Sequence, residues 1–90
     1  MYSLYKLKEE EEELVKESKD LDDFFPILKK VLKQNRQKMI RTFLNDRGEI
    51  IIDFGFFSVF FIIRIDKGKI KEDIYKEFDH KLEEYCFEGK

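Results

Sequence analysis

The feature that most constrains the fold of this chain is an apolar segment, FSVFFIIRI, at residues 57–65. Successive residues of a β-strand point to opposite faces of its sheet, and in this segment both sets are largely apolar. A strand of this kind is usually central and covered on both sides, or it uses one face as an interface. The segment is too short to span a bilayer, which takes about 20 apolar residues. We therefore expect a central strand and no membrane insertion.

Two further strands precede this segment. Residues 39–44 and 49–54 are rich in apolar and β-branched side chains, and the turn signal Asn-Asp-Arg-Gly separates them. This pattern predicts a β-hairpin. Asp53 is the charged residue that follows three isoleucines in the second strand, and we expect it to pair with Arg41 or Arg64 across the sheet.

Two segments carry apolar residues at the spacing of a helix face. In residues 22–34, Asp22 or Asp23 is the expected N-cap, and Pro26 then falls in the first turn, where its missing N–H costs little. The second helical segment is 70–86. The apolar positions of the two segments are Leu21, Phe24, Phe25, Leu28, Val31 and Leu32, then Ile70, Ile74, Phe78, Leu82 and Cys86.

Residues 3–18 allow two interpretations. Their apolar side chains fall at offsets 0, 3, 10 and 11, which suits a helix face, and Lys and Glu favour helix. Alternatively, two strands pair with each other and the glutamate run 9–13 forms the turn. We favour the helix and keep the strands as the alternative.

These elements predict an α+β fold, with an antiparallel β-meander of three or more strands packed against two or three helices. A chain of 90 residues is near the smallest size that folds alone. We expect a single domain over residues 1–90, without room for a large active-site cleft.

Residues that could carry out catalysis are scarce. The chain has one histidine, His80, and one cysteine, Cys86, and neither a phosphate-binding glycine loop nor a catalytic triad is recognisable. Glu77 and His80 have the spacing of a helical metal-ligand pair, but such sites need further ligands, and a solvated helix face is the favoured interpretation. We predict a protein that is not an enzyme, without catalytic residues, metal or cofactor. The lone cysteine and the lack of an apolar signal sequence indicate a cytoplasmic protein.

Charge is segregated along the chain, although the net charge is only −2. Residues 9–23 contain nine acids and two bases, a balance of −7, whereas residues 24–45 contain six bases and no acid. Because local fields steer association, we expect the acidic segment to meet a basic surface of a larger protein. The candidate partner-binding residues are Glu9, Glu10, Glu12, Glu13 and Glu17, and on a helix Glu9, Glu12, Glu13 and Glu17 would share one face.

Two other surfaces are candidates. The basic segment 29–41 is an alternative site for nucleic acid, although the isoelectric point of about 5.5 argues against this use. Its phosphate-binding candidates are Lys29, Lys30, Lys33, Arg36 and Lys38. If one face of the Phe-rich strand is uncovered, Phe56, Phe57 and Phe60 are candidates for a homodimer or partner interface.

The segment IDFGFFSVFFII at residues 52–63 resembles one that recurs in small accessory proteins of Gram-positive phages and conjugative elements. Those proteins carry Asp-aromatic-Gly, then a Ser, then a Phe-rich strand, and the helix start LDDFF at residues 21–25 is similar to theirs. Where many of them have a Ser-His pair, this chain has Phe56-Phe57. The resemblance implies a phage- or mobile-element-encoded protein that binds and modulates or inhibits a host macromolecule, such as a nuclease or a defence protein.

Overall fold

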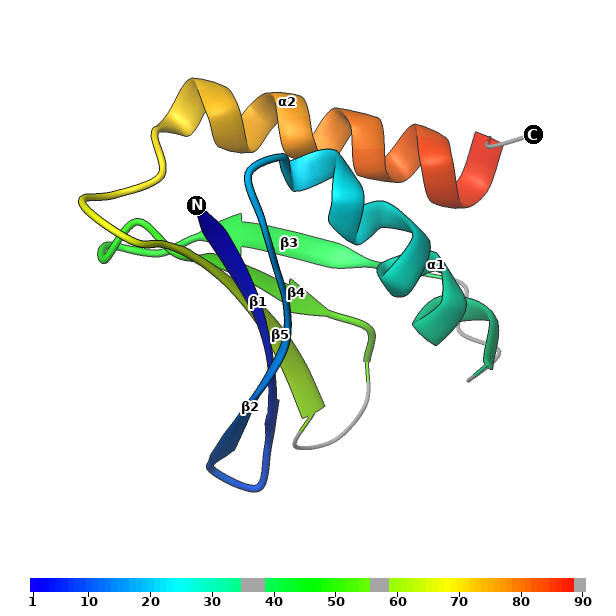
Figure 1. Cartoon of the computed structure of the whole chain (residues 1–90). Coiled ribbons are helices and arrows are strands. Elements are labelled where there is room, and N and C mark those ends of the chain that lie inside the picture. Colours follow the sequence, from blue (N-terminus) through cyan, green and yellow to red (C-terminus); the bar gives the residue numbers. More distant parts are fainter. Residues whose placement is uncertain (35–38, 56–58, 89–90) are drawn as a thin grey trace.

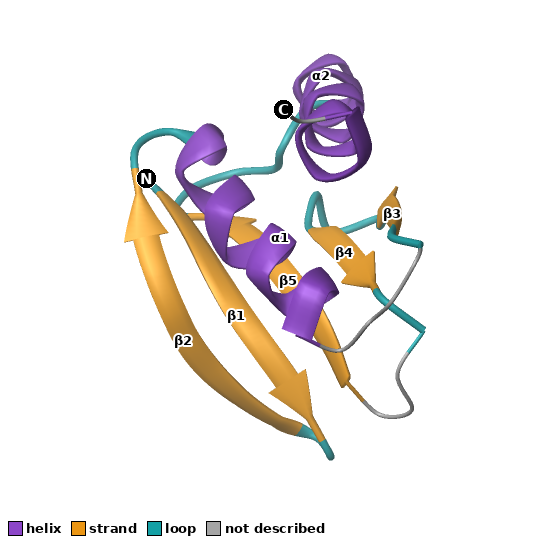
Figure 2. Ribbon diagram, turned by 90° about the vertical axis from the view of Figure 1, so that its right-hand side faces the viewer, coloured by secondary structure: helices purple, strands orange, loops and turns teal. Residues whose placement is uncertain are grey.

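The computed structural model describes residues 1–34, 39–55 and 59–88. Within these ranges five antiparallel strands form one sheet in the order β2-β1-β5-β4-β3, and both helices lie on the same side of it (Figure 1, Figure 2). This arrangement confirms the α+β fold predicted from the sequence. The elements are β1 (Tyr2–Lys8), β2 (Glu11–Ser18), the 3₁₀ turn η1 (Leu21–Phe24), α1 (Phe25–Gln34), β3 (Arg41–Leu44), β4 (Ile50–Asp53), β5 (Val59–Ile65), α2 (Glu72–Glu83) and the π-helical turn η2 (Glu84–Glu88).

Strand β5 occupies the centre of the sheet, as its two apolar faces predict. It pairs with β1 on one side and with β4 on the other. Alternate residues, such as Phe61 and Ile63, face the helices and belong to the core. Ile62 points to the opposite face, where no helix of the described ranges lies. Of the two arrangements expected for such a strand, helices on both faces or one face free to form an interface, the described part of the chain shows helices on one face only.

The core lies between the sheet and the two helices. Phe25 of α1 and Phe78 of α2 pack with their ring centres 5.5 Å apart, which joins the two helices to each other. Phe54, just after β4, meets Phe61 edge to face at 5.6 Å. The completely buried side chains come from every layer: Phe24, Phe54, Leu4, Leu28, Ile50, Ile52, Ile63 and Leu82.

The first helix starts differently from the prediction. Asp20, with an extended backbone, is the N-cap, and its carboxylate accepts a hydrogen bond from the Asp22 N–H at 3.0 Å. A 3₁₀ turn follows, and the α-helix begins only at Phe25. Asp22 and Asp23 are therefore first-turn residues, and the expected cap at either of them is wrong. Their negative charge still lies at the helix N-terminus, where the helix dipole favours it.

The predicted hairpin at residues 39–54 is confirmed, with shorter strands. Asn45 forms its turn, because its side-chain oxygen accepts from the N–H groups of Arg47 at 3.0 Å and Glu49 at 2.9 Å. The predicted pairing of Asp53 is confirmed with Arg41, at 2.9 Å. These contacts fix the register of the β3 and β4 edge of the sheet.

Residues 2–18 form two strands, and the favoured helix is wrong. β1 pairs with β2 and also with the central strand β5, so that Leu4 is fully buried opposite Ile63. These pairings with a distant part of the chain outweigh the local helix preference of Lys and Glu. The alternative interpretation is correct in its two paired strands, but its turn is shorter than expected, because Glu11, Glu12 and Glu13 already belong to β2.

Candidate functional site

The acidic segment supplies the turn and the second strand of the hairpin formed by β1 and β2, and this turn points away from α2 (Figure 1). We call β1, β2 and their turn the acidic hairpin. Five consecutive glutamates, residues 9–13, occupy its turn and the start of β2, and all five are exposed. The turn end of the acidic hairpin thus carries five consecutive acidic side chains.

The turn of the acidic hairpin has an unusual backbone. Lys8 and Glu11 are paired, and the two residues between them, Glu9 and Glu10, have φ values of +50° and +71°. A two-residue type I′ turn requires positive φ at both positions, and Gly or Asn normally supplies it. Two glutamates there carry a conformational cost of about 1 kcal/mol each. Strain of this kind is found preferentially at functional positions.

The strand geometry divides the glutamates between two faces of the sheet. The register places Glu13 beside Lys6 and Glu11 beside Lys8, on the side of the helices. Glu12 lies on the opposite face. Beyond a bulge at β2, Glu17 joins Glu12 there and accepts a hydrogen bond from Ser3 at 3.4 Å. The single acidic face expected from a helix is therefore wrong.

Glu12 is held by Arg64 of the central strand. Both terminal nitrogens of the guanidinium donate to the Glu12 carboxylate at 2.7 Å, and Arg64 Nε donates to Glu49. The guanidinium also lies 4.9 Å from the centre of the Tyr5 ring, a cation–π distance. Arg64 thereby ties β2 to the residue that precedes β4.

This contact shifts the pKa of all three ionisable groups. The hydrogen bonds from Arg64 lower the pKa of Glu12. Partial burial raises the pKa of Glu49, but hydrogen bonds from Asn45 and Arg64 outweigh it, so the net direction is down. The pKa of Arg64 is raised, mainly by its hydrogen bonds to Glu12. All three groups are charged at neutral pH.

The remaining predicted acids are available to a partner. Within the described part of the chain, Glu9, Glu10 and Glu13 form no ion pair closer than 4.0 Å. A shallow surface hollow of about 400 Å³ lies among the side chains at this end of the hairpin. Its lining residues are Lys6, Lys8, Glu9, Glu11 and Glu13.

The structure describes three of the five predicted basic residues, and all three lie on α1. Lys29 is half-buried on α1, with its Nζ 5.1 Å from the centre of the Tyr85 ring. Lys30 and Lys33 are exposed on the same helix. Arg36 and Lys38 lie outside the described residues.

Of the three residues predicted to form an aromatic interface, the structure describes Phe60. It is half-buried on the sheet face that bears no helix in the described ranges, between Leu7 of β1 and Asp53 of β4. Phe56 and Phe57 lie outside the described residues.

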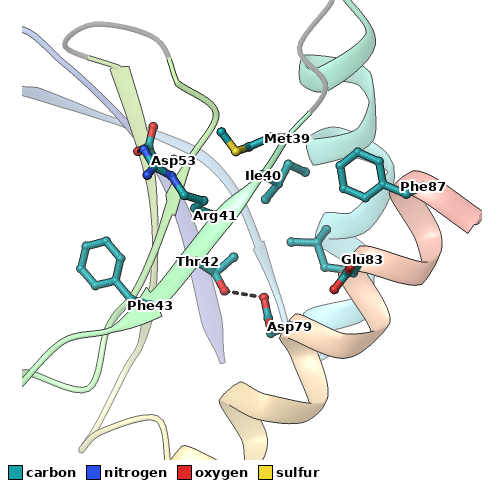
Figure 3. Close-up of a pocket in the computed structure, with 10 residues that line it drawn as sticks. Met39, Ile40, Arg41, Thr42, Phe43, Asp53, Asp79, Glu83 and Phe87 are labelled. Atoms are coloured by element: carbon teal, nitrogen blue, oxygen red, sulfur yellow. Dashed lines mark hydrogen bonds and ion pairs between the residues drawn. The ribbon is translucent and has the colours of Figure 1, made fainter.

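Sequence reasoning missed a groove of about 790 Å³ between β3 and the C-terminal half of α2 (Figure 3). Thr42 lies beside it and donates to Asp79 at 2.5 Å. The Tyr75 hydroxyl donates to the Thr42 carbonyl at 2.9 Å. Tyr75 and Asp79 are four residues apart on α2, and this spacing is the signal that could have indicated their joint contact with a strand. Apolar side chains of Met39, Ile40, Leu82 and Phe87 form much of the rest of the lining.

The two residues with the most versatile side-chain chemistry lie in ordinary surroundings. His80 is exposed and contacts Glu84 at 2.6 Å, while Glu77 pairs with Lys81 at 2.9 Å. Cys86 is half-buried against the core, and this burial raises the pKa of its thiol. A raised pKa disfavours the thiolate, the nucleophilic form.

Among the described helices, none is long and apolar enough to cross a membrane. Comparisons of the chain with protein-family models, with curated proteins and with solved structures found no match.

Proposed function

We propose that this chain is a non-enzymatic interaction protein whose acidic hairpin docks on a basic surface of a larger protein. The observation that carries the proposal is the turn of that hairpin. The turn and the start of β2 present five consecutive glutamates, and the two in the turn hold left-handed backbone conformations that glutamate does not favour. A simple solvated turn would be more stable with Asn or Gly at those positions.

The charge arrangement supports a basic partner. Lys6 and Lys8 on β1 offset part of the charge of the hairpin end, but residues 6–13 still sum to −3 because they contain five acids and two bases. Opposite potentials on two surfaces raise the rate of association and exclude partners of the wrong sign. A protein that handles nucleic acid, such as a nuclease, carries a basic groove of the required sign.

The acidic hairpin is also held in place by the rest of the sheet. Its strand β1 is hydrogen-bonded to the central strand β5, and its strand β2 is tied across the sheet by the contact between Glu12 and Arg64. A pre-ordered binding element loses less conformational entropy when it binds. In this proposal the protein is encoded by a phage or mobile element, acts in the cytoplasm of the host cell, and inhibits or recruits its partner.

Affinity capture with a four-residue variant tests the proposal. We would neutralise Glu9, Glu10, Glu11 and Glu13 to Gln and keep Glu12, because Arg64 needs it. The tagged chain is used to capture proteins from host lysate treated with nuclease. We expect the wild type to retain a basic protein that is released by salt or by added heparin, and we expect the variant to lose it.

A matched control removes the same charge elsewhere. The variant with Glu72, Glu77, Glu83 and Glu84 changed to Gln alters α2 and the turn after it, and it should retain the partner. Equal losses in the two variants would contradict a specific role for the hairpin. Capture that disappears on nuclease treatment would instead favour nucleic acid and the basic segment 29–41, the alternative from the sequence.

A further inference from the structure

The groove between β3 and α2 gathers apolar side chains that are unusually exposed for their type. Met39, just before β3, is 52% exposed, and Phe87 of η2 on the opposite side is 47% exposed. Ile40 and Leu82 add further apolar lining on the two sides (Figure 3). A concave apolar surface with a few polar groups is the usual form of a binding site. The groove is therefore a candidate contact site that is separate from the acidic hairpin.

The acids on the helix side of this groove have no basic partner. Asp79 and Glu83 both line the groove and lie four residues apart on α2, so they are neighbours on one face of the helix. Within residues 1–34, 39–55 and 59–88, neither forms an ion pair closer than 4.0 Å. Arg41 also lines the groove, but it is bound to Asp53 at 2.9 Å. The described lining thus has three acids against one base.

Other acids of α2 are paired with bases on the same helix. Glu72 contacts Lys76 at 3.3 Å, and Glu77 contacts Lys81 at 2.9 Å. Opposite charges four residues apart stabilise a helix, whereas like charges at that spacing destabilise it. Asp79 and Glu83 have the destabilising arrangement, and they have it on the side that borders the groove. A cationic group bound in the groove would relieve this repulsion.

The edge of β3 limits how a ligand can bind beside it. The Asn45 N–H donates to the Glu49 carbonyl at 3.0 Å, and hydrogen-bonded pairs alternate along an antiparallel ladder, so the backbone groups of Thr42 point away from β4. The Tyr75 hydroxyl donates to this outward carbonyl at 2.9 Å. Tyr75 therefore occupies the position of an added strand, and the side chains of the groove are what remains to hold a ligand.

We propose that the groove binds a short segment of another protein in which Arg or Lys is flanked by apolar residues. The cationic head pairs with Glu83 and Asp79, and its aliphatic stem and the apolar neighbours cover Met39 and Phe87. A protein segment fits this site better than a free small molecule. The apolar side chains on both walls are half-exposed, which leaves part of the occupant in water, whereas sites for small molecules bury most of their ligand.

NMR titration of the full ¹⁵N-labelled chain with the peptide acetyl-Leu-Arg-Leu-amide tests the proposal. We expect the amide signals of Ile40, Thr42 and Phe87 to shift, with an affinity in the millimolar range because an exposed ion pair contributes little. The peptide acetyl-Leu-Gln-Leu-amide lacks the charge and should bind about threefold more weakly or worse. Added salt should reduce this difference between the two peptides.

Single substitutions test the position of the cation. Glu83→Gln should weaken binding of the Arg peptide by about threefold. The matched control is Glu84→Gln, because Glu84 is the next residue but contacts His80 instead, and its loss should leave the affinity unchanged. The variant with four Gln substitutions in the acidic hairpin should bind this peptide as the wild type does. That result separates the groove from the proposed function of the hairpin.

Three results would overturn the proposal. The first is that the groove signals do not move at about 10 mM Arg peptide. The second is equal binding of the Arg and Gln peptides, or equal effects of Glu83→Gln and Glu84→Gln, since charge would then have no role. The third is binding of butylguanidinium as tightly as the Arg peptide, because the occupant would then be a small organic cation.

Discussion

Arg64 is the residue through which the acidic hairpin and the rest of the sheet are joined electrostatically. Its guanidinium binds Glu12 of β2, two strands away, and Glu49, the residue before β4. We predict that Arg64→Gln lowers the free energy of unfolding at pH 7 by about 1–2 kcal/mol, after allowance for the partial exposure of the groups. Arg41→Gln is the control, because its contact with Asp53 is a more exposed surface pair and should cost less than about 1 kcal/mol. Urea denaturation measures both.

The same contact predicts a pH dependence. The pKa values of Glu12 and Glu49 are lowered from 4.5 in the folded state, so the folded state binds fewer protons than the unfolded state in that region. Their contribution is therefore complete above about pH 5 and is lost as the pH falls through the folded-state values. The difference in stability between wild type and Arg64→Gln should shrink from pH 7 to pH 3. A difference of the same size at both pH values would mean that these carboxylates are not its source.

Substitutions at two glycines compare the effect of backbone conformation with the effect of steric crowding around an added Cβ. Gly48 and Gly68 both have positive φ, +76° and +85°, which disfavours any side chain. A Cβ at Gly48 would lie 2.2 Å from the Lys69 Cβ, whereas one at Gly68 would meet nothing within 4 Å. We predict a loss of about 3 kcal/mol or more for Gly48→Ala and about 1 kcal/mol for Gly68→Ala in thermal unfolding. Similar losses would show that the loop at Lys69 moves aside.

At the scale of elements, the turn of the acidic hairpin offers a direct test of strain. Replacing Glu9 and Glu10 by Asn-Gly supplies the residues that a type I′ turn prefers. We expect a gain of about 1 kcal/mol, or roughly 4–8 °C in melting temperature. The control with Gln at both positions removes the same charge without the conformational gain. If the Gln control stabilises the chain as much as Asn-Gly, charge repulsion rather than backbone strain accounts for the effect.

The elements also show what sequence reasoning can predict. Residues 57–65 are predictable as the central strand because both of their faces are apolar. This local pattern is typical of a strand in the middle of a sheet. The hairpin at residues 39–54 follows from a local turn signal. By contrast, residues 3–18 contain good helix formers, and their strand pairing depends on β5, more than 40 residues away in sequence. The two-glutamate turn has no sequence signature at all, since its residues are unfavourable for it.

For the candidate site, the run of acidic residues could be predicted from the sequence, but the side-chain contacts of those residues could not. The acidic segment is evident from composition, and the structure places five of its glutamates at the turn of the acidic hairpin and the start of β2. That Glu12 is bound by Arg64 while Glu13 is not depends on the alternation of β2, which a helix assignment cannot provide. The pairing of Asp53 with Arg41 was predictable because a hairpin register fixes it. Contacts within one hairpin are therefore accessible from sequence, and contacts across the sheet are not.

At the scale of the whole molecule, the described sheet has two different sides. Ile62 and Ile63 are consecutive residues of β5 that point to opposite sides, so substitutions at these positions compare the two. Ile63 is fully buried in the core, and Ile62 is 6% exposed on the sheet face opposite the described helices. Ile63→Ala leaves an enclosed cavity and should cost about 3–4 kcal/mol. Ile62→Ala removes the same atoms, but its paired neighbours Tyr5 and Ile51 are only half-buried, so water can enter the space. We expect a loss of about 1–2 kcal/mol there, measured by urea denaturation of dilute protein.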